Sequence, residues 1–251
     1  MTAYAESVGR RYRAVVSEHH NAFGQPVGFP VEGWTARQRP PRTPMVGRWC
    51  RVETLDVARH AASLHEANRD DRKGRNWTYL SSDGFDDLDA YSAWLEKISA
   101  GDDPFFHAII DQSSGKAVGI AAFLRIDASN GVIEVGHINY SPRLQRTVAA
   151  TEAMALMMGR VFDELGYRRY EWKCDSLNAP SRAAAERLGF RFEGVFRQAL
   201  VYKGRNRDTA WYSITDQEWP AMRSALDRWL DPGNFDEEGR QRTRLTPSLL
   251  R

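Results

Sequence analysis

The chain has 251 residues, of which 42% are hydrophobic and 27% charged, a composition typical of a globular protein with a full core. Its 35 basic and 33 acidic residues almost cancel, so the charge balance argues against a general nucleic-acid-binding protein. Two cysteines are too few for a disulfide framework or a cysteine-only zinc site. The sequence lacks an apolar run long enough to span a membrane, and its N-terminus lacks an apolar signal core. We therefore expect a cytoplasmic protein without a membrane partner.

Residues 1–45 differ from the rest because five prolines alternate with arginines there. Proline removes backbone donors and blocks helix interiors, so most of this segment cannot be helical. The pattern predicts a short helix near Ala5–Phe23 and then an extended arm. We expect the arm to pack on the domain because Phe29 and Trp34 need burial, with a solvated tail as the alternative.

The first half of the main domain, residues 46–219, reads as a strand, two helices and a run of strands. Trp49–Leu55 is the first strand, and Asp56 is placed to cap the helix that follows. The polar stretch Arg69–Phe85 is predicted as a loop, and Asp86–Ile98 as a second amphipathic helix. Three strands then form an antiparallel meander with short turns, and they span Phe105–Ile110, Ala117–Ile126 and Val132–Tyr140.

After the meander the hydrophobic period changes. A long apolar-striped helix, Val148–Leu165, ends at Gly166 and is followed by the strand Arg169–Cys174 and the helix Asn178–Leu188. The chain then gives two strands, a basic turn between them and a last helix, in the order Phe190–Phe196, Lys203–Arg207, Thr209–Thr215 and Glu218–Leu230. A strand–helix–strand crossover within an antiparallel run requires a mixed sheet, here of about seven strands flanked by helices. Residues 220–251 are expected to form a C-terminal helix and tail.

The junction between the meander and the long helix has the features of an anion site. The first N–H groups of a helix have no intrahelical acceptor and carry partial positive charge. Arg143 and Arg146 add full charges, while Ala149 and Ala150 leave room for a ligand to approach the backbone. The segment therefore predicts a phosphate or pyrophosphate site. An ordinary helix start with two surface arginines is the alternative.

Two motifs together carry a family resemblance. Gln145-Arg-Thr-Val-Ala-Ala150, followed by Asn178, Ser181 and Gly189-Phe190, resembles the GNAT superfamily of acyl-CoA-dependent N-acetyltransferases. The residues of three segments are most similar to those of the ribosomal-protein N-terminal acetyltransferase (RimJ/RimL-type) branch. These segments are Asn178–Ser181, Gly189–Gly194 and Arg205–Asp208. The resemblance covers about Gly47 to Trp219, and it implies an α/β GNAT fold whose crossover binds acyl-CoA.

Two positions depart from the family pattern. Val148 stands where the pattern has its first glycine, but a residue entering a helix has negative φ, so the loop can still form. Ala185 stands where a tyrosine often serves as general acid.

The resemblance assigns roles to individual residues. Acetyl-CoA would be held by the end of the third meander strand, the start of the long helix and the start of the next helix, at Ile138, Asn139, Tyr140, Gln145, Arg146, Thr147, Val148, Ala149, Ala150, Asn178 and Ser181. Ser181 would also contact the departing thiolate in place of the missing tyrosine, unless it serves only as an N-cap. Cys174 is read as a packing residue, because this family transfers the acetyl group directly.

Deprotonation of the acceptor amine needs a base. Glu134 is the first candidate, since strand alternation places it opposite the apolar Ile133 and Val135; the alternative is a surface glutamate paired across the sheet. His137 is the second candidate and is expected on the other side of the strand. The acceptor would be bound by two aromatic and two acidic residues, Trp77, Tyr79, Glu171 and Asp175. The six histidines form no convincing metal-ligand set, so no metal is expected.

Three functions are compared at this point. The first is transfer of an acetyl group from acetyl-CoA to a primary amine, either a protein N-terminus or a small molecule. The second is a catalytically weak GNAT module that binds acyl-CoA or a partner, which Val148 and Ala185 favour. The third is an RNA- or ribosome-associated protein, because only five of the basic residues are lysine and arginine suits phosphate. The acceptor and the existence of a homodimer stay open.

Overall fold

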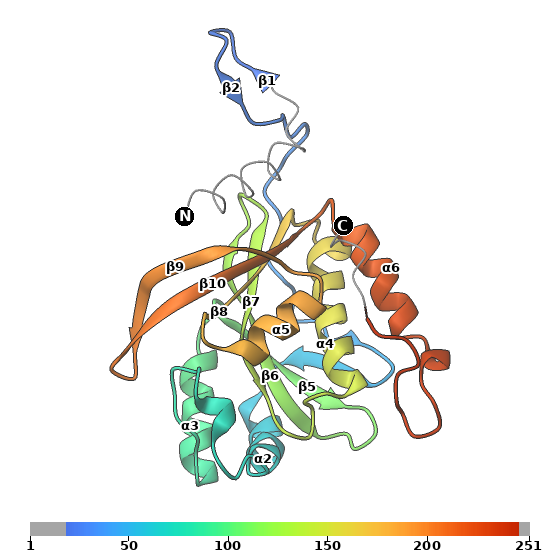
Figure 1. Ribbon diagram of the computed structural model, residues 1–251. Helices are drawn as coiled ribbons and strands as arrows, with labels where there is room; N and C mark the ends of the chain where they lie inside the picture. Colours follow the sequence, from blue (N-terminus) through green and yellow to red (C-terminus); the bar gives the residue numbers. More distant parts are fainter. Residues whose placement is uncertain (1–18, 246–251) are drawn as a thin grey trace. The chain divides into compact units, whose positions relative to one another are not determined.

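The computed structural model describes residues 19–245, and the chain divides into two compact units, residues 1–35 and 36–251 (Figure 1). In the first unit, β1 (His19–His20) pairs antiparallel with β2 (Pro26–Val27). The helix predicted near Ala5–Phe23 is therefore wrong for its last five residues, and its residues 5–18 lie outside the described residues. The physical reason is local: the Asn21 side chain accepts hydrogen bonds from the N–H groups of Phe23 and Gln25, which favours a turn. Packing of the arm on the domain stays a prediction.

The second unit is built on an eight-stranded sheet in the order β3-β4-β5-β6-β7-β8-β10-β9. The strands are β3 (Met45–Val46), β4 (Cys50–Thr54), β5 (Phe105–Asp111), β6 (Ala117–Asp127), β7 (Val132–Tyr140), β8 (Arg169–Asp175), β9 (Arg191–Tyr202) and β10 (Arg205–Thr215). Neighbouring strands of this sheet are antiparallel except β7 and β8, which are parallel. The predicted mixed, mostly antiparallel sheet is confirmed, with short β3 as the additional strand.

The helices begin and end close to the predicted residues. They are α2 (Val57–Asn68), α3 (Leu88–Ser99), α4 (Val148–Gly159), α5 (Ala179–Arg187) and α6 (Trp219–Trp229), with short turns η1 (Arg75–Trp77), η2 (Arg160–Glu164) and η3 (Pro232–Asn234). Asp56 caps α2 as predicted, since its carboxylate accepts a hydrogen bond from the N–H of Arg59. The predicted long helix is α4 continued by the π-helical turn η2, and Gly166 follows it with φ +66°.

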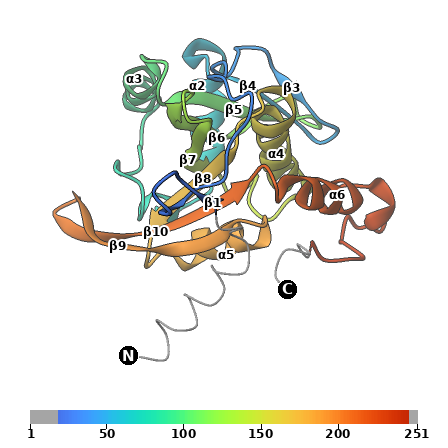
Figure 2. The same cartoon turned by 90° about the horizontal axis from the view of Figure 1, so that it is seen from above.

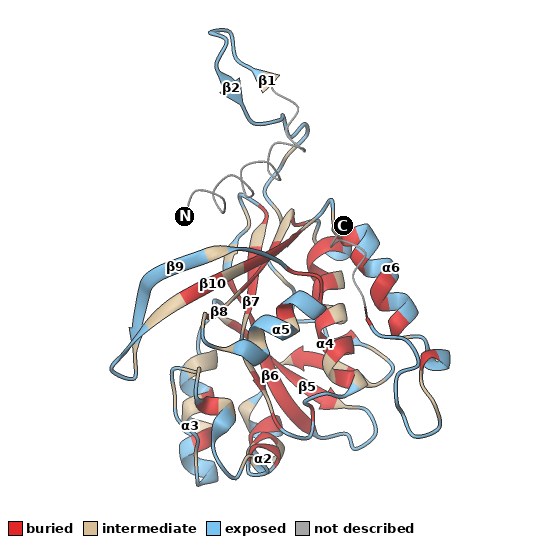
Figure 3. Cartoon of the chain, in the orientation of Figure 1, coloured by how far each residue is buried: buried red, intermediate tan, exposed pale blue. Residues whose placement is uncertain are grey.

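Each face of the sheet has its own hydrophobic core (Figures 1 and 2). One core includes Met157, Tyr170 and Met222 and joins the sheet to α4, α5 and α6. The other includes Leu64 and Leu95 and joins β5 and β6 to α2 and α3. Figure 3 shows the buried residues concentrated in β5–β8, while the edge strand β9 is exposed along its length. The middle strands β5–β8 are therefore the most buried part of the sheet.

The last hairpin is longer than predicted. Its turn is only Lys203–Gly204, with φ of +50° and +69°, and Arg205–Arg207 already belong to β10. Positive φ at both central residues is the geometry of a type I′ turn, whose twist matches that of the flanking strands, so pairing continues to the tip. The expected five-residue basic turn Lys203–Arg207 is therefore wrong.

The parallel pair β7–β8 is short. Four positions pair, from Val132 with Arg169 to Val135 with Trp172. Beyond them β7 contains a bulge: His137 has φ +48°, and the register with β6 shifts between Gly136 and Asn139. Pairing between β7 and β8 consequently ends at Val135 and Trp172, and the remaining residues of the two strands are not paired with each other. We call the place where the two strands diverge the opening.

Two buried charges on the α4–η2 helix hold the chain segment before β4. The Glu152 carboxylate is 6% exposed and accepts three hydrogen bonds of 2.7 Å from the backbone N–H groups of residues 48–50. The guanidinium of Arg160 donates to the carbonyl groups of Thr43 and Pro44. Gly47 allows this approach, because a Cβ there would lie 2.3 Å from the Glu152 side chain.

Replacing Glu152 by glutamine should lower the free energy of unfolding by about 3 kcal/mol, because the amide cannot accept three charge-assisted hydrogen bonds and leaves buried N–H groups unpaired. Urea unfolding measures the change. Glu66→Gln on α2, where the carboxylate is 50% exposed and pairs with Lys116, is the matched control and should cost less than about 1 kcal/mol. Equal losses in the two variants would contradict this account of Glu152.

Candidate active site

The backbone of β7 presents hydrogen-bonding groups to the opening. The N–H of Ser141 donates to the carbonyl of Val118 in β6, and backbone groups alternate in direction along a strand. The peptide groups of Asn139 therefore point toward β6, whereas those of Ile138 and Tyr140 point toward the opening. The Tyr140 carbonyl already accepts from the side chains of Gln145 and Asn76, at 2.7 and 3.2 Å. A ligand in the opening thus meets the Ile138 backbone and the N–H of Tyr140.

The start of α4 lies directly beyond the end of β7. Arg146 adopts φ +62°, and Thr147 caps the helix by accepting from the N–H of Ala150 at 3.2 Å. The N–H groups of Val148 and Ala149 are the first two of the helix and have no intrahelical acceptor. Val148 lies in regular helix, so the departure from glycine is accommodated and the left-handed residue is Arg146. Oriented N–H groups of this kind attract negative charge, and we call residues 146–150 the anion cradle.

The two arginines of this segment do different things. The guanidinium of Arg146 is exposed beside the cradle. Arg143 instead pairs with Glu66 and Asp70, at 3.1 and 2.7 Å. Its charge therefore fastens the loop before α4 to the end of α2, and only Arg146 is placed to add a full charge to the cradle.

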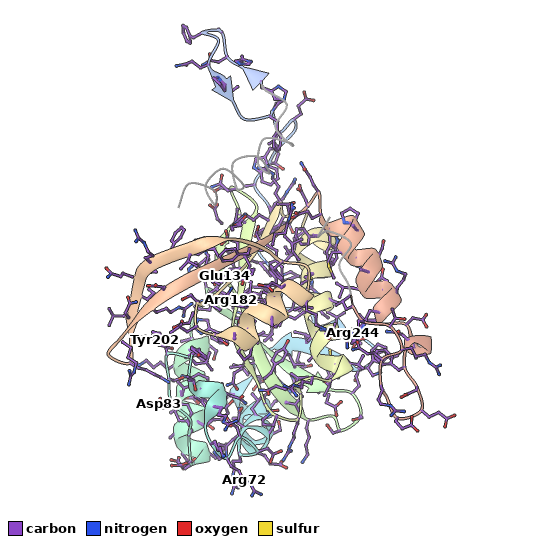
Figure 4. All side chains as sticks on the ribbon, viewed as in Figure 1. Arg72, Asp83, Glu134, Arg182, Tyr202 and Arg244 are labelled. Carbon is purple, nitrogen blue, oxygen red and sulfur yellow. The ribbon has the colours of Figure 1, made fainter. Side chains whose placement is uncertain are left out.

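A buried ionic cluster lies on the same strands. Glu134 is 3% exposed and lies opposite the core residues Ile133 and Val135, as alternation predicts. Its Oε2 accepts from Arg125 at 2.7 Å and from Lys173 at 2.9 Å. Figure 4 labels the position of Glu134 in the sheet. The Lys173 ammonium lies 2.7 Å from Glu171 and 3.7 Å above the Trp211 ring. A lysine of the chain thus occupies the space between two residues that the sequence suggested for amine chemistry.

Lys173 was missed in the sequence analysis. The available signal was its position two residues after Glu171, on the same face of one strand. Arg169 extends the cluster, because it donates to Glu171 at 2.7 Å and also pairs with Glu193. Each of the two buried carboxylates of this cluster, Glu134 and Glu171, is therefore paired with at least one cation.

His137 lies on the same side of β7 as Glu134, so its expected placement on the other side is wrong. The bulge at His137 interrupts the alternation, and the ring packs against Phe106 with centroids 5.2 Å apart. The surrounding protein and the positive charges of Arg125 and Arg207 lower the pKa of His137 below its ordinary value. The imidazole is therefore neutral at neutral pH.

The first turn of α5 faces the other side of the opening. The side-chain oxygen of Asn178 accepts from the N–H of Ser181 at 3.2 Å, so Asn178 is the cap and Ser181 is the third helical residue. The Ser181 hydroxyl accepts from the indole N–H of Trp172 at 3.0 Å. The hydroxyl also makes a hydrogen bond with the neighbouring Cys174 sulfur. Burial raises the pKa of the Cys174 thiol by more than this hydrogen bond lowers it, which agrees with a packing role for that cysteine.

The residues proposed to bind the acceptor already have partners within the described chain. Trp77 is buried in an aromatic cluster with Phe85 and Trp94. The hydroxyl of Tyr79 donates to the carbonyl of Leu177 at 3.1 Å, and Asp175 accepts from Tyr202 at 2.8 Å.

Lys203 at the hairpin tip joins the hairpin to the loop that follows α2. It reaches the Trp77 carbonyl at 2.7 Å and Asp83 at 2.8 Å. In Figure 4 Tyr202 and Asp83 mark the two sides of this junction. The loop 75–83 is therefore held against the tip of the last hairpin, at one end of the site.

The described residues contain neither a metal-binding cluster nor a membrane-spanning helix. In residues 19–245, no group of three or more His, Cys, Asp or Glu side chains is arranged to hold a metal ion. Over the same range, no helix combines the length and apolar character needed to cross a membrane.

The mixed sheet, its single parallel pair and the crossover helix between the two parallel strands define an α/β acyltransferase fold. The family model "Acetyltransferase (GNAT) domain" matches residues 51–191, more than half of the chain. The chain belongs to the GNAT acetyltransferase family, and the resemblance found in the sequence is confirmed.

Individual proteins of the family share this fold. A GCN5-related N-acetyltransferase from Brucella melitensis has 49% sequence identity and a TM-score of 0.84, covering 86% of this chain and 97% of that one. The microcin C7 self-immunity acetyltransferase MccE, solved with acetyl-CoA and AMP, is 20% identical with a TM-score of 0.58, covering 67% and 93%. YdaF of Bacillus subtilis (strain 168), whose name describes a ribosomal N-acetyltransferase, is 29% identical over 42% of this chain. The chain spans only 57% of the length of YdaF.

Lys173→Met tests the ionic cluster. Removing the ammonium leaves Glu134 and Glu171 facing each other in a buried site, so the free energy of unfolding should fall by about 3 to 5 kcal/mol at about pH 7.5. Arg125 and Arg169 still pair with the two carboxylates, and protonation of one carboxylate at acidic pH relieves the remaining repulsion between them. The loss should therefore be smaller at about pH 5.

Urea unfolding at the two pH values checks this prediction. The double variant Lys173→Met/Glu171→Gln removes one of the two facing carboxylates and should recover part of the stability lost near pH 7.5. A loss that is identical at both pH values would show that Lys173 acts by packing rather than by charge.

Proposed function

We propose that the protein transfers an acetyl group from acetyl-CoA directly to a primary amine, on a protein N-terminus or on a small molecule. The observation that carries the proposal is the opening between β7 and β8, with free strand backbone on one side and the anion cradle of α4 beside it. Acetyl-CoA has the matching parts, since its pantetheine arm carries amides and its pyrophosphate is an anion. It supplies the activated acetyl thioester.

Three groups of residues would hold acetyl-CoA. The cradle would bind the pyrophosphate through N–H groups of Arg146–Ala150, and the backbone of Ile138 and Tyr140 would pair with the pantetheine arm. Gln145 shapes this region by fixing the Tyr140 carbonyl, and Asn178 would hydrogen-bond the pantetheine from the start of α5. Asn139 lies on this strand with its backbone turned toward β6, so it would not pair with the pantetheine arm through its peptide groups.

Ala149→Asp tests the cradle. A carboxylate at the second residue of α4 places negative charge and bulk against the pyrophosphate, so the Kd for acetyl-CoA should rise at least about 100-fold by calorimetry. Ala221→Asp adds the same charge to the exposed first turn of α6 and should leave the Kd unchanged. A folded Ala149→Asp protein with unchanged affinity would reject this placement of acetyl-CoA.

The chemistry requires a neutral amine, and two side chains near the bulge are candidates for taking its proton. Glu134 is our proposed base, acting directly or through water, because it faces the acceptor side of β7. His137 is the alternative, since its neutral ring lies on the same face. We propose the Ser181 hydroxyl as the donor to the departing sulfur, because its hydrogen is not used for capping.

Glu134→Gln should lower kcat by roughly 10²–10⁴-fold, because the amide has no basicity. His137→Gln should stay within about tenfold of the original protein. Glu171→Gln changes a carboxylate of the same ionic cluster and is the matched control; it should act mainly on the KM of the acceptor. Steady-state assays over pH give the result. A large kcat loss in His137→Gln with little change in Glu134→Gln would transfer the role of base to His137.

For the acceptor we propose a primary amine that enters under the loop 75–83, beside Tyr79 and Trp77. Glu171 and Asp175 would favour its ammonium form on entry, although both already have partners. Lys173 between Glu134 and Glu171 favours a second candidate function, a module that binds acetyl-CoA with weak catalysis. Tight acetyl-CoA binding without turnover on any amine would support that alternative.

A further inference from the structure

Asn139 has an unusual environment for a polar side chain. It is 2% exposed, and neither its amide oxygen nor its amide nitrogen has a hydrogen-bond partner within the described chain. A buried amide without partners costs a protein about 1 to 3 kcal/mol, so most such groups are paired. Asn139 is therefore a group whose partner should come from outside the chain.

The Asn139 side chain lines a small cavity on the acceptor side of the sheet. Most of its walls are apolar and come from Leu80, Trp94, Phe106 and Ile120. The remaining wall residues are His137 and, from the loop 75–83, Ser81 and Ser82. Over the described residues no Asp, Glu, Lys or Arg side chain lines it. Because the pKa of His137 is lowered, the cavity carries no charge at neutral pH.

The cavity and the opening share one stretch of β7, residues 137–139. Asn139 follows Ile138, whose backbone faces the opening, and His137 belongs both to the bulge and to the cavity wall. A group attached close to the reactive nitrogen of an acceptor bound at the opening would therefore face this cavity. The cavity therefore belongs to the acceptor rather than to acetyl-CoA.

We propose that this cavity binds an uncharged hydroxyl or amide group that the acceptor carries next to its amine, and that Asn139 pairs with that group. The proposal rests on the function proposed above and deepens it by naming the class of acceptor. An asparagine amide offers both a donor and an acceptor, which suits a hydroxyl or an amide equally. A purely aliphatic amine would leave Asn139 unpaired, and a second charge on the acceptor would be desolvated without a counter-ion.

The test compares three acceptors and two variants. L-serinamide carries a hydroxyl and an amide, n-butylamine is aliphatic, and 1,3-diaminopropane carries a second ammonium. Asn139→Leu has nearly the same shape but no polar atoms. Asn68→Leu is the matched control, because Asn68 is also buried and also has an unpartnered amide oxygen but lies outside the cavity.

We expect kcat/KM to be highest for serinamide in the original protein. Asn139→Leu should reduce the serinamide-to-butylamine ratio by about 10- to 100-fold, the range of one or two lost hydrogen bonds in a buried site. Asn68→Leu should leave that ratio unchanged. Asn139→Leu should also keep or raise the melting temperature, because it removes an unpaired buried amide, whereas a structural asparagine would lower it.

The outcomes separate this inference from the proposed function. Amines acetylated by the original protein with the same ratio in Asn139→Leu would overturn the role of Asn139 and leave the acetyltransferase intact. If no amine is acetylated, the proposed function fails, and saturation-transfer NMR still decides the cavity: serinamide must bind the original protein and not Asn139→Leu. A Ser-Gly-Gly peptide used faster than serinamide would identify polypeptide N-termini as the source of the group, and the reverse would identify small amides.

Discussion

The site depends on one short parallel contact in an otherwise antiparallel sheet. Parallel neighbours cannot be joined by a tight turn, so the chain must leave the end of β7, cross the sheet and return at the start of β8. That crossover is α4, and its first turn necessarily lies at the carboxyl end of β7. The bulge at His137 then ends the pairing after four positions. Strand opening and helix start are therefore brought together by the same topological requirement.

The buried carboxylates beside the β7–β8 contact are compensated by cations of the same sheet. Glu134 and Glu171 lie side by side on the two parallel strands and repel each other in a site of low polarity. Lys173 and Arg125 compensate them, and Arg169 links the pair to Glu193 on the edge strand. Such a network is stable only when complete, because removing one partner leaves an unpaired charge in the interior. The geometry around the bulge is therefore fixed by electrostatics as well as by backbone pairing.

The sequence predicted the elements because their signals are local. Periodicity, the Asp56 cap, Gly166 and the motif at Gln145–Ala150 each act within a few residues, and together they gave the strand order and the cradle. The bulge was not predicted, although Gly136 is an isolated glycine within a strand, because the positive φ falls on the next residue, His137. Lys173 was missed because its partners come from three strands and only Glu171 lies close to it in the sequence. The type I′ turn at Lys203–Gly204 was missed because a single glycine within a basic run resembles a longer loop.

The α4–η2 helix has two roles, one in binding a ligand and one in holding a distant segment of the chain. Its first turn would receive the pyrophosphate, while Glu152 and Arg160 hold the chain between residues 43 and 50 by hydrogen bonds to its backbone. That chain segment leads into β4, so its detachment would expose one edge of the sheet. A ligand that stabilises the helix also lowers the population of such partly opened states. Amide hydrogen exchange and protease cleavage in this distant segment would then slow down when the cradle is filled, although no ligand atom touches it.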